Sequence, residues 1–316
     1  MVRAHKPSAI GVGESTPQPI LSVKDGIVEV TLPSGDSLTI HQYGATVTSW
    51  KSQGQEQIFL SQKALLDGSK PIRGGIPLVF PVFGPPPKDH ATSALPQHGF
   101  ARNSNWEFLG KSSAESTESR DKLAVKLDFG LSHTMLTEGF RKAWPYEFGL
   151  VYSVTLSEGT LSTSIQVRNE GQQNFEFQVL LHTYLKVEDI SDVRVKGLDS
   201  KIYIDKTRNA SSHTETSSAL AIAEETDRVY KDLDPTVPIV VSSAKDDKPF
   251  FSITRESLTD VVVWNPWIEK AKGMADFGPD EAYKNMICVE AGSVSAWQTL
   301  EAGDSWEGGQ SIKSRL

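Results

Sequence analysis

The sequence predicts an all-β protein built as an antiparallel sandwich. Three observations support this class. Apolar and polar residues alternate over many short stretches, Gly, Pro, Asn and Asp separate those stretches, and no long segment has the 3.6-residue apolar repeat of a helix. Neither a Gly-x-Gly-x-x-Gly sequence after a strand nor a P-loop lysine motif occurs. A nucleotide-binding α/β enzyme is therefore not expected.

A polar segment precedes the first predicted strand. Residues 1–19 carry Pro, Ser and Gly and contain no apolar run, so we expect a flexible lead-in without a signal sequence, followed by one domain over residues 20–316. No stretch approaches the roughly 18 consecutive apolar residues of a membrane span. The one cysteine, Cys288, cannot form an intrachain disulfide. We therefore expect a cytoplasmic protein that does not associate with a membrane.

The first hairpin is predicted at residues 27–40. Val28, Val30 and Leu32 alternate with polar residues and would share one face of a strand. The Pro-Ser-Gly-Asp sequence that follows predicts a turn, and a return strand would begin at Leu38.

Further strands are predicted by the same alternation. Residues 137–146 and 280–283 could form short helical turns, whereas the polar residues 115–121 and 211–218 are expected to be exposed loops. The remaining strands are expected at residues 123–129, 150–156, 161–167, 175–187, 239–242, 250–254 and 261–264.

The charge balance limits the partners. The 316 residues include 32 Lys and Arg against 40 Asp and Glu, which gives a formal net charge of −8. Such a protein lacks the broad basic surface that non-specific nucleic-acid binding needs, so no nucleic-acid partner is expected. Because the net charge also repels an anionic metabolite, any phosphate site must be a local cluster of Arg or Lys.

Residues 177–185 place a titratable side chain on a sheet surface. As a strand, this segment would carry Gln178, His182 and Tyr184 on one face. Histidine is the one side chain that titrates near neutral pH without help from its surroundings. His182 is therefore a candidate for proton transfer, and a hydrogen-bonded structural histidine is the alternative.

A second segment combines a carboxylate with aromatic side chains. The apolar run at residues 285–289 ends in Glu290, and two residues with minimal side chains follow. Residues 264–267 read Trp-Asn-Pro-Trp. Aromatic faces such as that of Trp264 cover the C–H surfaces of sugars, and amides bond their hydroxyls. A solvated carboxylate at a strand end and tryptophans of the core are the alternatives.

Two loops rich in Gly and Pro carry arginines. Arg73 precedes a Gly-Gly pair, and residues 97–102 read Gln-His-Gly-Phe-Ala-Arg, ending in Arg102. The planar guanidinium group suits phosphate oxygens, although a surface charge is the alternative for each arginine. His98 is either a ligand contact or a donor that braces the loop. No H-x-H or H-E-x-x-H sequence occurs, so no metal is expected.

Together, these motifs resemble the hexose-6-phosphate branch of the aldose 1-epimerases, with fungal members nearest. The likeness spans about residues 38–300, and the pairing of Trp-Asn-Pro-Trp with a downstream Cys-Val-Glu-Ala-Gly is specific. It implies a galactose-mutarotase-like β-supersandwich with its site in a sheet cleft, and neither cofactor nor metal. The matching segments are residues 72–77, 80–86, 97–102, 180–184, 226–230 and 264–292.

The resemblance also implies a role for individual residues. His182 would be the catalytic acid and Glu290 the catalytic base. We add His98 and Trp264 to the substrate contacts from the patterns described above. The substrate-binding residues that match the family are Arg73, Gln97, Arg102 and Asp227.

The implied reaction is interconversion of the α and β anomers of a hexose 6-phosphate such as D-glucose 6-phosphate. A carboxylate takes the proton of the C1 hydroxyl while an acid protonates the ring oxygen, and each such group is worth roughly 10²- to 10⁴-fold in rate. The open aldehyde then rotates about C1–C2, and the pair acts in reverse. We expect Glu290 ionised and His182 protonated, a state that their mutual salt link and a nearby phosphate dianion would favour.

Three alternatives use the same residues. A non-catalytic sugar-phosphate-binding or sensing protein on this fold would not need both His182 and Glu290 within reach of C1. An aldose 1-epimerase for unphosphorylated hexoses would give the two arginines no anion to bind. A glycoside hydrolase would use two carboxylates, Asp227 and Glu290. A monomeric protein with a small-molecule partner is expected.

Overall fold

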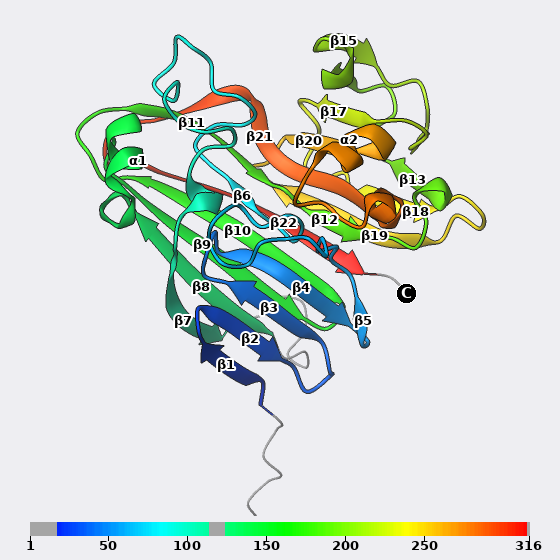
Figure 1. The fold of residues 1–316 in the computed structure, drawn as a ribbon, viewed down its shortest axis with the longest axis horizontal. Helices are drawn as coiled ribbons and strands as arrows, with labels where there is room; N and C mark the ends of the chain where they lie inside the picture. Colours follow the sequence, from blue (N-terminus) through cyan, green and yellow to red (C-terminus); the bar gives the residue numbers. More distant parts are fainter. Residues whose placement is uncertain (1–17, 114–123, 315–316) are drawn as a thin grey trace, which may run out of the picture.

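The computed structural model describes residues 18–113 and 124–314, which form three antiparallel sheets with few helices (Figure 1). The all-β antiparallel class predicted from the alternating pattern is confirmed. Most of the predicted lead-in at residues 1–19 lies outside the described residues, and so does the loop predicted at residues 115–121. The assignment of residues 20–316 to one domain stays a prediction.

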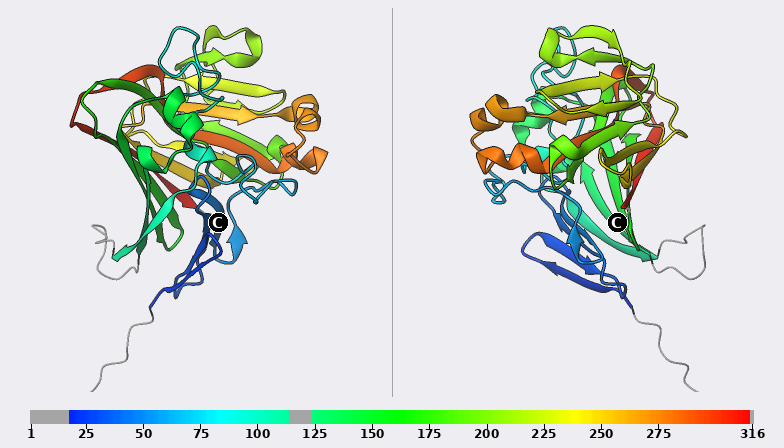
Figure 2. Two further views of the ribbon diagram at one scale, coloured as in Figure 1. Left: turned by 60° about the vertical axis from the view of Figure 1, so that its left-hand side comes forward. Right: turned by 90° about the vertical axis from the view of Figure 1, so that its right-hand side faces the viewer.

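The N-terminal sheet has five strands in sequence order, drawn in blue on the lower side of the molecule in Figures 1 and 2. The predicted hairpin is present, because Val28 pairs with Ile40 and Val30 with Leu38. The strands are β1 (Ile20–Lys24), β2 (Ile27–Thr31), β3 (Ser37–His41), β4 (Thr46–Ser52) and β5 (Gln55–Glu56).

A nine-stranded sheet forms one large layer of the sandwich. Its strands alternate buried and partly buried residues, as the period-two pattern predicts. In spatial order, they are β16 (Ala219–Ala221), β13 (Val193–Lys196), β18 (Ile239–Ser243), β19 (Pro249–Glu256), β22 (Ser305–Ser314), β10 (Thr160–Asn169), β9 (Phe148–Ser157), β8 (Val125–Ser132) and β7 (Glu107–Ser113).

An eight-stranded sheet positions most of the site described below. Its longest strand, β21, runs across the molecule in Figure 1. In spatial order, the strands are β15 (Ser211–Thr214), β14 (Ile202–Asp205), β17 (Thr226–Tyr230), β20 (Asp260–Asn265), β21 (Met286–Leu300), β11 (Phe175–Leu181) and β6 (Leu78–Val79), and β12 (Tyr184–Lys186) pairs with β21.

Short helices connect the strands. The two predicted helical turns are present as α1 and η5, and the Thr137 side chain caps α1 by accepting a hydrogen bond from the Phe140 N–H. Among the described residues, no helix is long and apolar enough to cross a membrane. The helices are α1 (Glu138–Ala143), α2 (Trp267–Gly273), η1 (Ala101–Asn103), η2 (His133–Met135), η3 (Ile190–Asp192), η4 (Lys206–Arg208) and η5 (Asp280–Asn285).

The eight-stranded sheet is apolar on both faces, which separates two clusters of buried residues. Leu181 and Val289 belong to the large cluster, which also contains residues of the other two sheets. Leu180 and Cys288 face the opposite way and belong to a smaller cluster. Because side chains alternate along a strand, one stretch of sequence serves both the sandwich core and the outer face that carries the site.

Three local predictions are wrong. Residues 211–218 include strand β15, which pairs with β14, so this polar segment is not simply a loop. The single strand predicted at residues 175–187 is interrupted at His182 and Thr183. Glu290 does not end a strand, because β21 continues through Gly292, where an added Cβ would lie 2.7 Å from the Leu180 side chain. The small residues after Glu290 therefore allow neighbouring strands to approach closely.

Candidate active site

Strand register places several polar side chains in one row on the outer face of the eight-stranded sheet. Asp227 of β17 lies opposite Trp264 of β20, and Trp264 lies opposite Cys288 of β21. Cys288 in turn lies opposite Tyr184 of β12. Glu290 is two residues beyond Cys288 on the same strand, so it projects from the same face.

A cavity of about 260 Å³ opens over this face. All eight site residues predicted from the sequence line it. Its volume is close to the lower end of the roughly 300–1,000 Å³ typical of ligand pockets, which suits a molecule the size of a monosaccharide. The lining residues are Arg73, Phe83, Gln97, His98, Arg102, His182, Lys206, Asp227, Val262, Trp264, Lys270, Met274 and Glu290.

Glycines hold the two arginine-bearing loops against the sheets. Gly75 has φ of +75°, and a Cβ there would lie 2.1 Å from the Val47 carbonyl oxygen. Its own carbonyl accepts a hydrogen bond from the Tyr184 N–H at 2.9 Å. Gly99 has φ of +71°, and a Cβ there would lie 2.1 Å from the Phe80 carbonyl oxygen. Only glycine combines this backbone conformation with such close approach, so the contacts with the Val47 and Phe80 carbonyls fix the position of both loops.

His182 and Glu290 meet at the floor of the cavity. The backbone N–H of His182 donates to the Pro77 carbonyl at 3.0 Å, and the His182 ring stacks on the Tyr184 ring with centroids 4.7 Å apart. His182 Nδ1 lies 3.2 Å from Glu290 Oε1. This approach falls outside hydrogen-bonding geometry, and within the described residues neither His182 Nδ1 nor Glu290 Oε2 has a hydrogen-bond partner. The pair therefore retains bonding capacity that the protein does not use.

Burial disfavours the charged form of each partner. Burial lowers the pKa of His182 well below its usual value, and the charges of Arg102 and Arg73 lower it further. Burial also raises the pKa of Glu290 well above its usual value, and the Asp227 charge adds to that increase. The sequence-based expectation was an ion pair, whereas burial opposes both of its charges in the protein alone. The neutral pair contains the same number of protons.

The two predicted arginines differ in their surroundings. Arg73 Nε lies 3.2 Å from Asp276 Oδ1, and its Nη1 donates to the Tyr184 hydroxyl at 3.3 Å. Arg102 donates from Nη2 to the Gln97 carbonyl at 3.1 Å, and its buried Nε has no partner within the described part of the chain. Burial lowers the pKa of Arg102 to about 10. Arg73 thus has a protein counter-ion, whereas Arg102 keeps a free donor.

Two lysines complete the positive charge of the cavity, and sequence patterns did not reveal them. Lys206 begins η4, and its Nζ lies 3.9 Å from the centre of the Phe83 ring. Within the described ranges, no carboxylate lies within 4.0 Å of that ammonium group. Lys270 instead pairs with Glu225 at 2.9 Å. Lys206 belongs to no motif, so only the fold shows that it reaches the site.

His98 is both a loop brace and a cavity residue. Its Nδ1 accepts a hydrogen bond from the Gly84 N–H at 3.2 Å, which leaves the ring proton on Nε2. Burial, with Arg102 and His182 nearby, lowers the pKa of His98 well below its usual value. Its ring centre lies 6.0 Å from that of His182. His98 therefore braces the loop and lines the cavity, and its Nε2 lies 3.3 Å from the Gln97 side-chain nitrogen.

Only the first residue of the Trp-Asn-Pro-Trp sequence lines the cavity. Asn265 is buried and donates to the carbonyls of Tyr283 and Met286, both at 2.9 Å, while its Oδ1 accepts from the Trp267 N–H. Trp267 packs on Tyr283 with ring centres 5.3 Å apart. The suggestion that Asn265 and Trp267 recognise sugar is therefore wrong, because both are used to join α2 to the start of β21.

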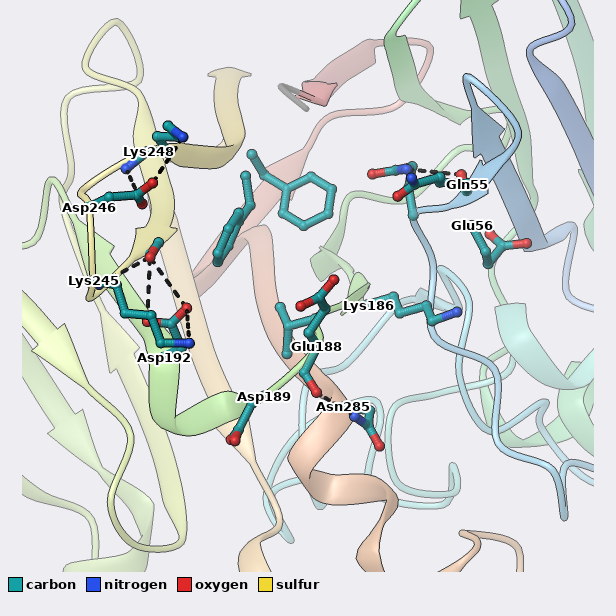
Figure 3. A pocket seen from close by; sticks show the side chains of 15 residues that line it. Gln55, Glu56, Lys186, Glu188, Asp189, Asp192, Lys245, Asp246, Lys248 and Asn285 are labelled. Atoms are coloured by element: carbon teal, nitrogen blue, oxygen red, sulfur yellow. Dashed lines mark hydrogen bonds and ion pairs between the residues drawn. The ribbon is translucent and has the colours of Figure 1, made fainter.

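A larger cavity, of about 720 Å³, lies between the β5–β12 region and the β18–β19 hairpin (Figure 3). It contains none of the predicted site residues and no histidine. Its Lys245 and Lys248 lie beside Asp192 and Asp246, at 3.6 and 3.0 Å. Lys186 also lines this cavity and forms no ion pair within the described residues, but no histidine lines it, so it lacks the histidine–carboxylate pair of the smaller cavity.

The comparisons with known proteins agree on the family. The family model described as "Aldose 1-epimerase" matches residues 27–313. A protein of Cenchrus ciliaris, provisionally named glucose-6-phosphate 1-epimerase, is 39% identical over 85% of this chain and 78% of its own length. One of Escherichia coli K12 with the same provisional name is 33% identical over 81% of this chain and 80% of its own.

Solved structures agree on the fold. A Salmonella typhimurium protein, provisionally described as a mutarotase, has a TM-score of 0.78 at 28% identity, covering 95% of both chains. Galactose 1-epimerase of Lactobacillus acidophilus has a TM-score of 0.67 at 15% identity, covering 93% of this chain and 96% of its own, which bears on the fold alone. The predicted galactose-mutarotase-like sandwich is confirmed.

Proposed function

The chain belongs to the aldose 1-epimerase family, and from this premise we propose that it interconverts the α and β anomers of a hexose 6-phosphate. D-glucose 6-phosphate is the first substrate to test, since curated relatives carry its name. One observation carries the proposal. A single cavity contains a histidine–carboxylate pair with unused bonding capacity, together with Lys206 and Arg102, which have no carboxylate partner among the described residues.

The arrangement of charge suggests how the substrate lies. The sugar C1 would lie against His182 and Glu290, and the phosphate would be bound by Lys206 and Arg102. A phosphate dianion is the natural partner for these two cations because the part of the chain that the structure describes supplies them with no carboxylate. Arg73, already neutralised by Asp276, would donate its remaining N–H groups to sugar oxygens or to the phosphate edge.

The remaining predicted residues would orient the ring. Asp227 would accept a hydrogen bond from a sugar hydroxyl, while burial raises its pKa. Gln97 and His98 would donate to other hydroxyls. Trp264, which is 8% exposed, would cover part of the C–H surface of the sugar. These groups would keep C1 close to the acid–base pair during ring opening.

The phosphate would also prepare the pair for proton transfer. Arg102, Arg73 and Lys206 all lower the pKa of His182 in the protein alone. A dianion bound among them would offset this effect and favour transfer of the shared proton from Glu290 to His182. Glu290 would then take the C1 hydroxyl proton while His182 protonates the ring oxygen. After rotation about C1–C2, the reverse transfers close the ring from the other face.

Anomer exchange measured by magnetisation-transfer NMR tests this proposal. Purified protein should exchange the anomers of glucose 6-phosphate well above the spontaneous rate, and unphosphorylated glucose much more slowly. His182→Asn and Glu290→Gln should each lower the enzymatic rate by roughly 10²-fold or more, since each removes one proton-transfer group. A folded protein that binds sugar phosphate without accelerating exchange would instead favour a binding or sensing role.

Two further expectations concern the cellular compartment and the oligomeric state. With one cysteine, Cys288, and no disulfide, we expect the protein to act in a reducing compartment such as the cytoplasm. We also expect a monomer, because the cavity is completed by residues of one chain. Cell fractionation and light scattering of the purified protein would check these two points.

A further inference from the structure

Three potential metal ligands of different chemistry converge below the cavity floor. His182, Cys288 and Glu290 each offer one ligand atom, and these atoms all lie within 4.8 Å of one another. All three residues are buried, with Cys288 at 0% and Glu290 at 1% exposure. The period-two geometry of β21 explains the arrangement, since Cys288 and Glu290 project from the same face while His182 approaches from the end of β11.

The cluster also has unused bonding capacity. Within the described residues, His182 Nδ1 and Glu290 Oε2 have no hydrogen-bond partner although both are buried. Unpartnered buried polar atoms are rare in native structures, and a bound ion or water is one of their ordinary explanations. Cys288 supplies the third group, and in the sheet it lies between Tyr184 and Trp264 of the neighbouring strands.

We propose that these three residues form an inhibitory binding site for thiophilic divalent cations, of which Zn²⁺ is the type case. Zinc takes nitrogen, thiolate and carboxylate ligands at about 2.0–2.3 Å, and sites with three protein ligands leave a fourth position for water. The donor set matches this description. The three ligand atoms, which lie within 4.8 Å of one another, would have to move closer together to bind one ion at these distances.

The ligand chemistry selects among cations. A thiolate favours Zn²⁺ and related soft ions, whereas Mg²⁺ and Ca²⁺ prefer sites made wholly of oxygen. Binding releases the protons of the Cys288 thiol and of protonated Glu290, so the ion and its two anionic ligands are neutral together. Arg73 and Arg102 oppose a cation in this region, although Asp276 offsets the charge of Arg73. These charges reduce the affinity without removing the site.

Occupation by zinc would stop the proposed reaction by a direct route. The Glu290 carboxylate would lose the lone pair that accepts the C1 hydroxyl proton, and His182 would be held by its Nδ1. Because His182 and Glu290 line the cavity, an ion reaches the cluster by the path that substrate uses. Cys288 does not line the cavity, so its removal should weaken metal binding and leave anomer exchange intact.

Cobalt(II) tests the site without reference to activity. Wild-type protein titrated with Co²⁺ should develop the near-ultraviolet thiolate-to-cobalt absorption and the visible bands of a four-coordinate ion at one equivalent, and Zn²⁺ should abolish both. Cys288→Ser should lose the thiolate absorption, and Cys288→Ala serves as a second variant if the serine hydroxyl disturbs folding. Absence of the thiolate absorption in folded wild-type protein would overturn the site.

Inhibition is measured separately on anomer exchange. Zn²⁺ should inhibit the wild-type enzyme reversibly, with recovery on adding a chelator, while Mg²⁺ at the same concentration should have no effect. In Cys288→Ser the concentration of Zn²⁺ for half inhibition should rise by about tenfold or more, because one of three ligands is lost. Equal inhibition of both proteins would refute the role of Cys288. If the protein proves not to be an epimerase, the cobalt spectra still decide the site.

Discussion

Lys206 gives the sharpest test of how the cavity binds a phosphorylated sugar. Its ammonium group lies 3.9 Å from the centre of the Phe83 ring, and within the described residues no carboxylate neutralises it. Lys206→Met removes the charge and keeps an unbranched apolar side chain against that ring. The fold should tolerate this change because Lys206 has no ion pair to lose.

The expected size of the effect follows from the charges. Two unit charges 4 Å apart interact by about 4 kcal/mol at the effective dielectric constant near a protein surface. Desolvation and competition with water reduce this, and a hydrogen bond to a charged group is worth about 1.5–3 kcal/mol net. Lys206→Met should therefore lower kcat/KM for glucose 6-phosphate by roughly 10- to 150-fold.

The same assay with unphosphorylated glucose provides the control substrate, and Lys270→Met provides the control variant. Lys270 also lines the cavity, but it pairs with Glu225 at 2.9 Å and its side chain is 43% exposed. Its replacement should lower kcat/KM by less than about fivefold, because exposed ion pairs contribute little. Turnover of free glucose should change little in either variant. An equal loss for both substrates in Lys206→Met would refute a phosphate contact.

Three further predictions concern stability and charge. Folding raises the pKa of Glu290, so the stability of the wild-type protein falls as pH rises from the unfolded pKa, near 4.3, towards the folded pKa. Glu290→Gln lacks this group, so its free energy of unfolding should gain about 1.4 kcal/mol per pH unit relative to wild type between those two pKa values. Urea unfolding at several pH values measures the difference. Gly99→Ala should cost at least about 2 kcal/mol of unfolding free energy, because its Cβ would meet the Phe80 carbonyl at 2.1 Å; a smaller loss would show that the loop can shift. Asp276→Asn leaves the Arg73 charge unpaired, so thermal unfolding should show a loss of about 1–3 kcal/mol in stability. Inorganic phosphate should partly restore this loss by binding Arg73. If phosphate stabilises the variant no more than it stabilises wild type, the pairing of Arg73 with Asp276 is contradicted.

The sequence was sufficient for the fold class and for the eight predicted residues that line the cavity. Alternation along short stretches reports which side chains face a core, and the Gly-rich and Trp-Asn-Pro-Trp motifs are contiguous in the chain. Those motifs also suggested a sugar-binding role for two residues that the structure uses for internal packing. Asn265 and Trp267 are used by the protein's own backbone and by Tyr283, a distinction that composition cannot make because an amide bonds a carbonyl as readily as a sugar hydroxyl.

The tertiary structure decided which charges are free and which protons are held. Lys206 comes from a segment without a recognisable motif, and only the folding of distant strands and loops brings it to the cavity and Asp276 to Arg73. The sequence suggested an ion pair of His182 and Glu290, whereas burial favours the uncharged form. Local patterns therefore determined the all-β class, and the resemblance of the motifs to a known family identified the reacting groups. Desolvation and cross-strand register, which depend on the whole packed chain, determined their electrostatics.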